Sequence, residues 1–347
     1  MTATALENIP AAKRPLSVIA IRIVALGIIA AMFAFLINNY LTIWQDWPGI
    51  RSLLSHLGWF SAADGKPLAG GALTQGWIQL LLYVALIGIV IVYALTNARQ
   101  PLRVDSTYLS AMAAFIIRAA FWSVLLIGLV DAVISFMRVE GFLASVFGQK
   151  MEINLGLSEF RGTYVHCPLI AVSLFIAAFT RSLGFTWLAL LVVVAELQIV
   201  IARFIFSYEQ AFMGDLVRFW YAALFLFASA YTLTKEGHVR VDVLYAGFSE
   251  RGKAWANATG CLLLGIPMCW VILAMGMAGK ATVINSPLLS FETSQSGFGL
   301  YVKYLMAGFL AVFAISMMIQ FTSYFLSAIA DLRSEPDKPS PPENPEP

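Results

Sequence analysis

Eight long runs of apolar residues follow one another along the chain, with more polar segments between them. They lie near residues 17–42, 77–97, 108–136, 164–181, 184–206, 212–234, 256–279 and 300–328. A helix rises about 1.5 Å per residue and the hydrocarbon core of a bilayer is about 30 Å thick, so roughly 20 apolar residues are enough to cross it. The pattern therefore predicts an all-α integral membrane protein with about eight transmembrane helices.

The composition fits a chain whose surface faces lipid. Hydrophobic residues make up 60% of the 347 residues and charged residues only 12%, whereas a soluble domain has about 25% charged residues. The net charge of +2 is spread along the chain. Because nucleic-acid binding needs a clustered basic face, we expect no nucleic acid among the partners. The lipid bilayer is the expected partner of the apolar surface.

The first apolar run is predicted to be a retained helix and not a cleaved signal peptide. Lys13 and Arg14 precede it, but the run continues for longer than the roughly 7–15 apolar residues of a signal peptide. Lys and Arg are more frequent in the segments that would share a side with both chain ends, so the positive-inside rule predicts that both termini are cytoplasmic.

The segments between the spans also give predictions. The long loops 43–76 and 137–163 contain Trp, Phe and Leu, and we expect short interfacial helices there. Near 241–256, apolar residues recur at helical spacing opposite charged ones, which predicts an amphipathic helix lying in the membrane interface. Residues 333–347 are rich in proline and polar residues, which predicts a disordered tail.

Three sequence blocks in the C-terminal half carry the most specific information. They are Ala202–Phe206, Tyr231–Tyr245 and Phe291–Lys303. In this order and at this spacing they resemble the small (Q) membrane subunit of tripartite ATP-independent periplasmic (TRAP) transporters, in particular the mannitol/chloroaromatic-like branch. The resemblance covers about residues 183–332, a four-helix region with the interfacial helix, and leaves residues 1–182 as an N-terminal extension with about four transmembrane helices.

The resemblance implies a scaffold or stator role in the inner membrane of a bacterial cell. In that family a separate large membrane subunit carries the substrate by sodium symport, and a periplasmic substrate-binding protein delivers it. The small subunit would then have no catalytic residues, no substrate or metal site and no cofactor. For the N-terminal extension we expect extra lipid-facing helices that widen the scaffold, or else a further protein contact.

Charged residues inside the predicted spans need partners, because each costs at least about 2.5–3.5 kcal/mol at a helix centre when it faces lipid. Arg118 and Glu196 lie well inside two spans. We predict that they form a structural ion pair joining the N-terminal helices to the family-like region; the alternative is that Glu196 binds a coupling cation. Arg22, near the start of the first span, is expected to extend toward the headgroups.

Other polar residues are candidates for an interface with the large subunit or the binding protein. The opposing interpretation is that they only form loop structure, interfacial ion pairs or a basic connector after the sixth span. These candidates are Arg203, Asp215, Arg218, His238, Arg240, Asp242, Glu292, Ser294 and Lys303.

Two other classes of membrane protein remain as alternatives. A membrane-bound haem enzyme subunit would need facing histidines within spans, but His166 alone lies near one. A self-sufficient secondary transporter would be expected to have paired broken helices at the midplane, and Gly265–Pro267 is the one apparent break.

Overall fold

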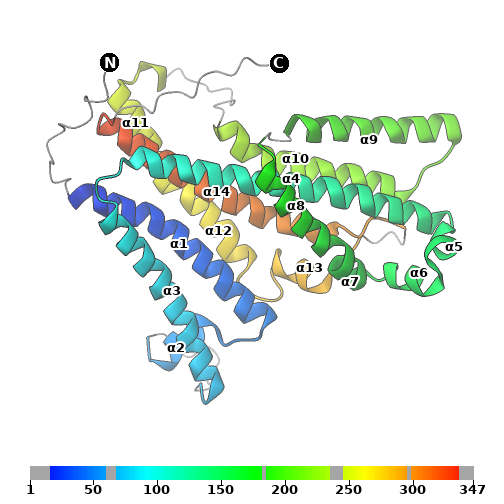
Figure 1. Cartoon of the computed structure of the whole chain (residues 1–347), viewed down its shortest axis with the longest axis horizontal. Helices are drawn as coiled ribbons and strands as arrows, with labels where there is room; N and C mark the ends of the chain where they lie inside the picture. The colour runs from blue at the N-terminus through cyan, green and yellow to red at the C-terminus, as the bar shows by residue number, and fades with distance from the viewer. Residues whose placement is uncertain (1–15, 60–67, 182–184, 235–244, 295–297, 336–347) are drawn as a thin grey trace, which may run out of the picture.

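The computed structural model describes residues 16–59, 68–181, 185–234, 245–294 and 298–335, which form helices joined by short connections (Figure 1). Within these residues there are no strands, and eight helical segments are long and apolar enough to cross a membrane. Five are single helices: α1 (Leu16–Trp44), α3 (Gly71–Thr96), α4 (Leu102–Val139), α9 (Phe185–Phe206) and α14 (Lys303–Leu332). Helix α10 (Ala211–Thr234) is also a single helix and forms a sixth span. The predicted all-α membrane fold with about eight spans is confirmed.

The remaining two spans are continuous helices that contain a wider turn. One joins α7 (Ser158–Arg161), the π-turn η1 (Gly162–His166) and α8 (Cys167–Phe179); the other joins α11 (Glu250–Gly260), the π-turn η3 (Cys261–Gly265) and α12 (Ile266–Gly276). Pro168 and Pro267 are each the second residue after a π-turn. Because proline has no backbone N–H to donate and clashes with the carbonyl four residues earlier, the helix widens there.

Short helices fill the two long loops, as expected. They are α2 (Gly49–His56) in the first loop, and α5 (Phe142–Phe147) and α6 (Gln149–Leu155) in the second; α13 (Asn285–Ser290) precedes the last span.

The helix expected near 241–256 takes a different form. Residues 241–244 lie outside the described part of the chain, Tyr245–Gly247 is one 3-10 turn (η2), and α11 begins at Glu250. Ser249 caps it, since its hydroxyl accepts a hydrogen bond from the Gly252 N–H at 3.2 Å. From this cap the helix runs without a break into the seventh span, so no separate interfacial helix is formed by the described residues. The tail beyond residue 335 and the motif residues His238, Arg240 and Asp242 also lie outside them.

Helix α4 occupies the middle of the molecule, where it lies against α8, α10 and α14 (Figure 1). Phe121 and Val124 of α4 share one apolar core with Phe219 of α10 and Met318 of α14. The expectation of lipid-facing N-terminal helices therefore fails for α4, which builds a common core with the C-terminal region.

A close approach between α4 and α10 depends on Gly128. A Cβ atom at this position would lie 2.4 Å from Nε1 of Trp220, so no larger residue fits without movement. The Trp220 Nε1–H donates to the carbonyl of Val124 at 3.2 Å. Gly128 thus leaves room for the indole against α4, where its N–H finds an acceptor.

Arg22 lies in the interior of the protein and does not extend to the headgroups. Its Nε donates to Asp105 Oδ2 at 2.6 Å, and its two other nitrogens donate to the carbonyls of Asn97 and Gln100 at 2.7 and 2.6 Å. Tyr93 donates to the other Asp105 oxygen at 2.8 Å. The prediction was wrong because the counter-ion lies 83 positions away, where the turn between α3 and α4 folds back onto α1.

The end of α14 meets the start of α4 at this same end of the molecule. Arg103 and Asp331 form an ion pair at 2.7 Å, and Ser323 lies within hydrogen-bonding distance of Ser106. Since Arg22 near the start of α1 also pairs with the start of α4, the first described helix begins and the last one ends on the same side of the molecule, as an even number of spans requires.

Candidate functional site

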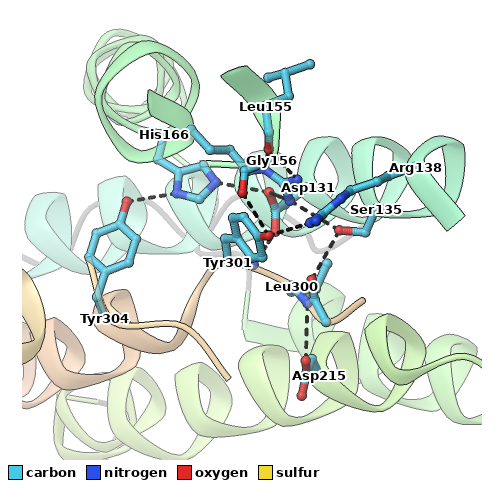
Figure 2. Close-up of polar contacts among 12 residues, drawn as sticks. Asp131, Ser135, Arg138, Leu155, Gly156, His166, Asp215, Leu300, Tyr301 and Tyr304 are labelled. Atoms are coloured by element: carbon cyan, nitrogen blue, oxygen red, sulfur yellow. Dashed lines mark hydrogen bonds and ion pairs between the residues drawn. The ribbon is translucent and has the colours of Figure 1, made fainter. Parts of the chain in front are cut away.

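A fully buried cluster of ionisable side chains lies at the opposite end of α4 (Figure 2). Its centre is Asp131, which faces three donors. Arg161 donates to Oδ1 at 2.9 Å, His166 Nε2 lies 3.2 Å from the same oxygen, and the backbone N–H of Tyr301 donates to Oδ2 at 2.8 Å. Asp131, Arg161 and His166 have no exposed side-chain surface.

Local helix geometry brings these groups together. Asp131, Ser135 and Arg138 are four and three residues apart, so they share one face of α4. Arg161 ends α7 and His166 ends the π-turn η1, so the wide turn lies between the two side chains that reach Asp131. Tyr301 comes from the segment just before α14.

Arg161 uses all its nitrogen atoms inside the protein. Its Nε and Nη2 donate to the Leu155 carbonyl at 2.9 and 2.7 Å, and Nη1 also donates to the Ser135 hydroxyl at 3.2 Å. Its guanidinium carbon lies 4.0 Å from the centre of the Tyr301 ring. The carboxylate, the carbonyl and the aromatic face around this guanidinium offset the cost of burying it.

Tyr301 and Tyr304 extend the cluster in two directions (Figure 2). The Tyr301 hydroxyl accepts from Arg138 and donates to the Gly156 carbonyl at 3.0 Å. The Tyr304 hydroxyl lies 2.8 Å from His166 Nδ1, so both ring nitrogens of this histidine have partners. The cluster thereby joins α4, the segment 155–166 and the beginning of α14.

A second carboxylate holds the neighbouring amide. Asp215, in the first turns of α10, accepts from the Leu300 N–H at 3.1 Å and from the Ser294 hydroxyl at 3.0 Å. Two consecutive backbone N–H groups, of Leu300 and Tyr301, are therefore fixed by carboxylates from two different helices. This arrangement clamps the segment that leads into the last span.

Gly162 allows the same segment to approach from another side. A Cβ at Gly162 would lie 2.3 Å from ring carbons of Phe291, so the phenyl ring occupies the space that a side chain would need. Phe291 packs edge-on against Tyr304, with ring centres 5.2 Å apart. The block from Phe291 to Lys303 is thus held by residues of the N-terminal extension as well as by α10.

The predicted pair of Arg118 and Glu196 does not form in the structure. No hydrogen bond or ion pair joins them; the Nε of half-buried Arg118 has no partner among the described residues, and Glu196 lies exposed on α9. The N-terminal helices and the family-like region are instead joined by Asp131 and its contact with Tyr301.

The other candidates form separate ion pairs. Arg203 lies 3.4 Å from Glu209, Arg218 lies 3.4 Å from Asp215, and Lys303 lies 2.5 Å from Glu292. All of these except Asp215 have substantially exposed side chains, so their pairing energies are small. Their role in docking stays a prediction.

A further contact joins the loops next to this end of α4. Tyr208, between α9 and α10, donates to Glu140 at 2.6 Å. Burial, followed by this hydrogen bond and the charge of Glu140, raises the pKa of Tyr208 from 10 to about 12, so the phenol keeps its proton to more alkaline pH than an ordinary tyrosine.

The sequence analysis named His166 but did not connect it with Asp131. The signal that could have found the cluster is the spacing of Asp131, Ser135 and Arg138 on one face of a predicted span, together with the single histidine near another span. The groups of the cluster are paired with one another, and within the described residues no three His, Cys, Asp or Glu side chains are grouped so that they could hold a metal ion.

The fold and the cluster define a multi-pass helical membrane protein whose buried charges hold helices and connecting segments together. Residues 189–330 match the family model described as "Tripartite ATP-independent periplasmic transporters, DctQ component". This match confirms the predicted resemblance to the small membrane subunit of TRAP transporters over most of the C-terminal region, without testing the branch. The family is one of transporter components, and with the eight candidate spans it places the chain in the inner membrane as a multi-pass protein. No curated protein and no solved structure matches the chain.

Proposed function

We propose that this chain is the scaffold, or stator, subunit of a sodium-coupled TRAP transporter. The observation that carries the proposal is the match of residues 189–330 to the DctQ component. In this proposal a separate large membrane subunit moves the substrate, a periplasmic binding protein delivers it, and this chain holds the large subunit steady in the bilayer. Both termini are cytoplasmic, and the protein belongs to the mannitol/chloroaromatic-like branch.

The packing of the molecule supports a rigid role. Asp131 and Asp215 fix consecutive amides before α14, and Arg22 fixes the turn between α3 and α4. A stator must resist displacement when another subunit moves against it. Interiors held by buried, fully paired charges change conformation only at considerable cost, because separating a pair leaves a charge uncompensated.

The proposal also gives the N-terminal extension a purpose. Residues 1–182 contribute α4 to the centre of the core, and the shorter helices α5 and α6 lie at one end of α4 (Figure 1). The extension therefore braces the family-like helices from within and enlarges the scaffold with α1 and α3 at its edge. The candidates Asp215, Arg218, Glu292 and Lys303 lie around the clamped segment and would face the large subunit or the docked binding protein.

Co-purification tests this proposal. The tagged chain, co-expressed with the large membrane subunit and extracted in mild detergent, is expected to bring that subunit with it in a fixed ratio. Recovery of the chain alone, in a form that takes up substrate after reconstitution without other proteins, would overturn the scaffold role in favour of a self-sufficient transporter.

A further inference from the structure

One helix carries an acidic side chain on its outer surface. Helix α9 is 22 residues long and Glu196 is its twelfth residue, with the apolar residues Val193, Leu197 and Val200 exposed around it. The opposite face of α9 contributes Leu188 and Ala195 to the core. Figure 1 shows α9 at the edge of the molecule, with α10 and α4 on its inner side.

Glu196 has no hydrogen-bond or ion-pair partner among the described residues. The nearest comparable charge on this helix, Arg203, already lies 3.4 Å from Glu209. A carboxylate at the centre of a transmembrane helix that faces lipid costs several kcal/mol, and such groups normally face protein or water and pair there. Of the eight candidate spans in the described residues, α9 is also the least buried within the chain.

Helix α3 provides a contrast. It too is largely exposed, with Val84 and Val92 on its surface, but its 26 residues include no charged side chain. Its outer face is therefore compatible with lipid alone. The surface of α9 is not, because Glu196 interrupts it.

We propose that the face of α9 formed by Val193, Glu196 and Val200 is covered by a transmembrane helix of the large subunit that carries an arginine or lysine opposite Glu196. These residues are three and four positions apart, so they form one stripe along the helix. A second copy of this chain would place two carboxylates against each other, which is unfavourable. This inference rests on the proposed function, since it assigns that partner to a particular surface.

Site-specific photo-crosslinking in the co-expressed complex tests the surface. A photoreactive residue at Val193 or Val200, which are 61% and 49% exposed, is expected to form an adduct with the large subunit. The matched control positions are Val84 and Val92 of α3, which are 58% and 61% exposed and are expected to give no protein adduct. The photoreactive residue leaves Glu196 in place, so the complex stays assembled.

The substitution Glu196→Gln tests the charge. Loss of a buried ion pair is expected to lower the amount of large subunit recovered by about tenfold, corresponding to about 1.4 kcal/mol. The control Glu250→Gln removes an exposed carboxylate that pairs with Lys253 at 2.9 Å and is expected to leave recovery unchanged.

Three results have distinct meanings. Adducts with the large subunit from α9 alone, together with the loss in Glu196→Gln, support the inference. If the complex forms but α9 gives adducts with a second copy of this chain or with no protein, or if Glu196→Gln recovers as much large subunit as wild type, the inference fails while the proposed function stands. If the wild-type chain brings no large subunit at all, both fail.

Discussion

At the scale of single residues, Asp131 has the largest expected effect on stability. It faces Arg161, His166 and the Tyr301 amide, which come from positions 30 to 170 residues away, and all of them are excluded from solvent. Removing one member of a buried ion pair leaves the other charged and unpaired. This lowers stability more than replacing both members by apolar residues of similar size.

We therefore expect Asp131→Asn to lower the free energy of unfolding by about 3 kcal/mol. The amide keeps the shape of the carboxylate but cannot neutralise Arg161. Unfolding in mixed micelles, followed by circular dichroism, measures the change. The matched control is Asp46→Asn, because Asp46 pairs with Lys280 at 2.5 Å on the surface, where both side chains are mostly exposed. Equal effects of the two substitutions would show that the Asp131 cluster has no special structural weight.

At the scale of helices, the contact between α4 and α10 depends on a missing side chain. Gly128→Ala would place a methyl group against the Trp220 indole and is expected to destabilise the protein by about 1–3 kcal/mol. Gly88→Ala on α3 meets no atom within 4 Å and is expected to be neutral or slightly stabilising, since alanine favours a helix. Thermal unfolding in detergent measures both, and the double variant with Trp220→Phe should recover part of the loss. A neutral Gly128→Ala would contradict the described packing.

The helices also show what sequence patterns can and cannot predict. Each span was predictable because about 20 apolar residues have few alternatives to a membrane helix. The partner of each helix was not, because an apolar residue such as Phe121 has no preference that identifies Phe219 or Met318 as its neighbour. The sequence analysis gave Arg22 no partner for the same reason: the α3–α4 turn that brings Asp105 to it is a tertiary feature. The continuous helix from Glu250 was missed because the charged residues that suggested an interfacial helix form its first turns.

At the scale of the whole molecule, the N-terminal extension and the family-like region share a core. We expect residues 183–347 expressed without the rest to be recovered mainly as aggregate, because Gln320 and Ser323 of α14 would lose their contacts with α4. Co-expression of residues 1–182 as a separate chain is expected to restore a monodisperse complex of the two fragments. Size-exclusion chromatography in detergent distinguishes these outcomes, and a stable, monodisperse C-terminal fragment would show that the extension is dispensable for folding.

The proposed transporter divides its work among this chain, the large membrane subunit and the periplasmic binding protein. In this proposal the substrate and sodium sites would belong to the large subunit, and this chain would provide a fixed surface through α9 and the clamped segment before α14. Substrate specificity would then not change when residues of this chain are exchanged.

Uptake by reconstituted proteoliposomes tests this central claim most directly. Vesicles that contain this chain and the large subunit, with the periplasmic binding protein outside, are expected to accumulate the substrate when an inward sodium gradient is imposed, and omission of any one protein should abolish uptake. Vesicles with this chain as the sole protein are expected to show none. Sodium-driven uptake by this chain alone, or full uptake by the large subunit and binding protein without it, would contradict the account.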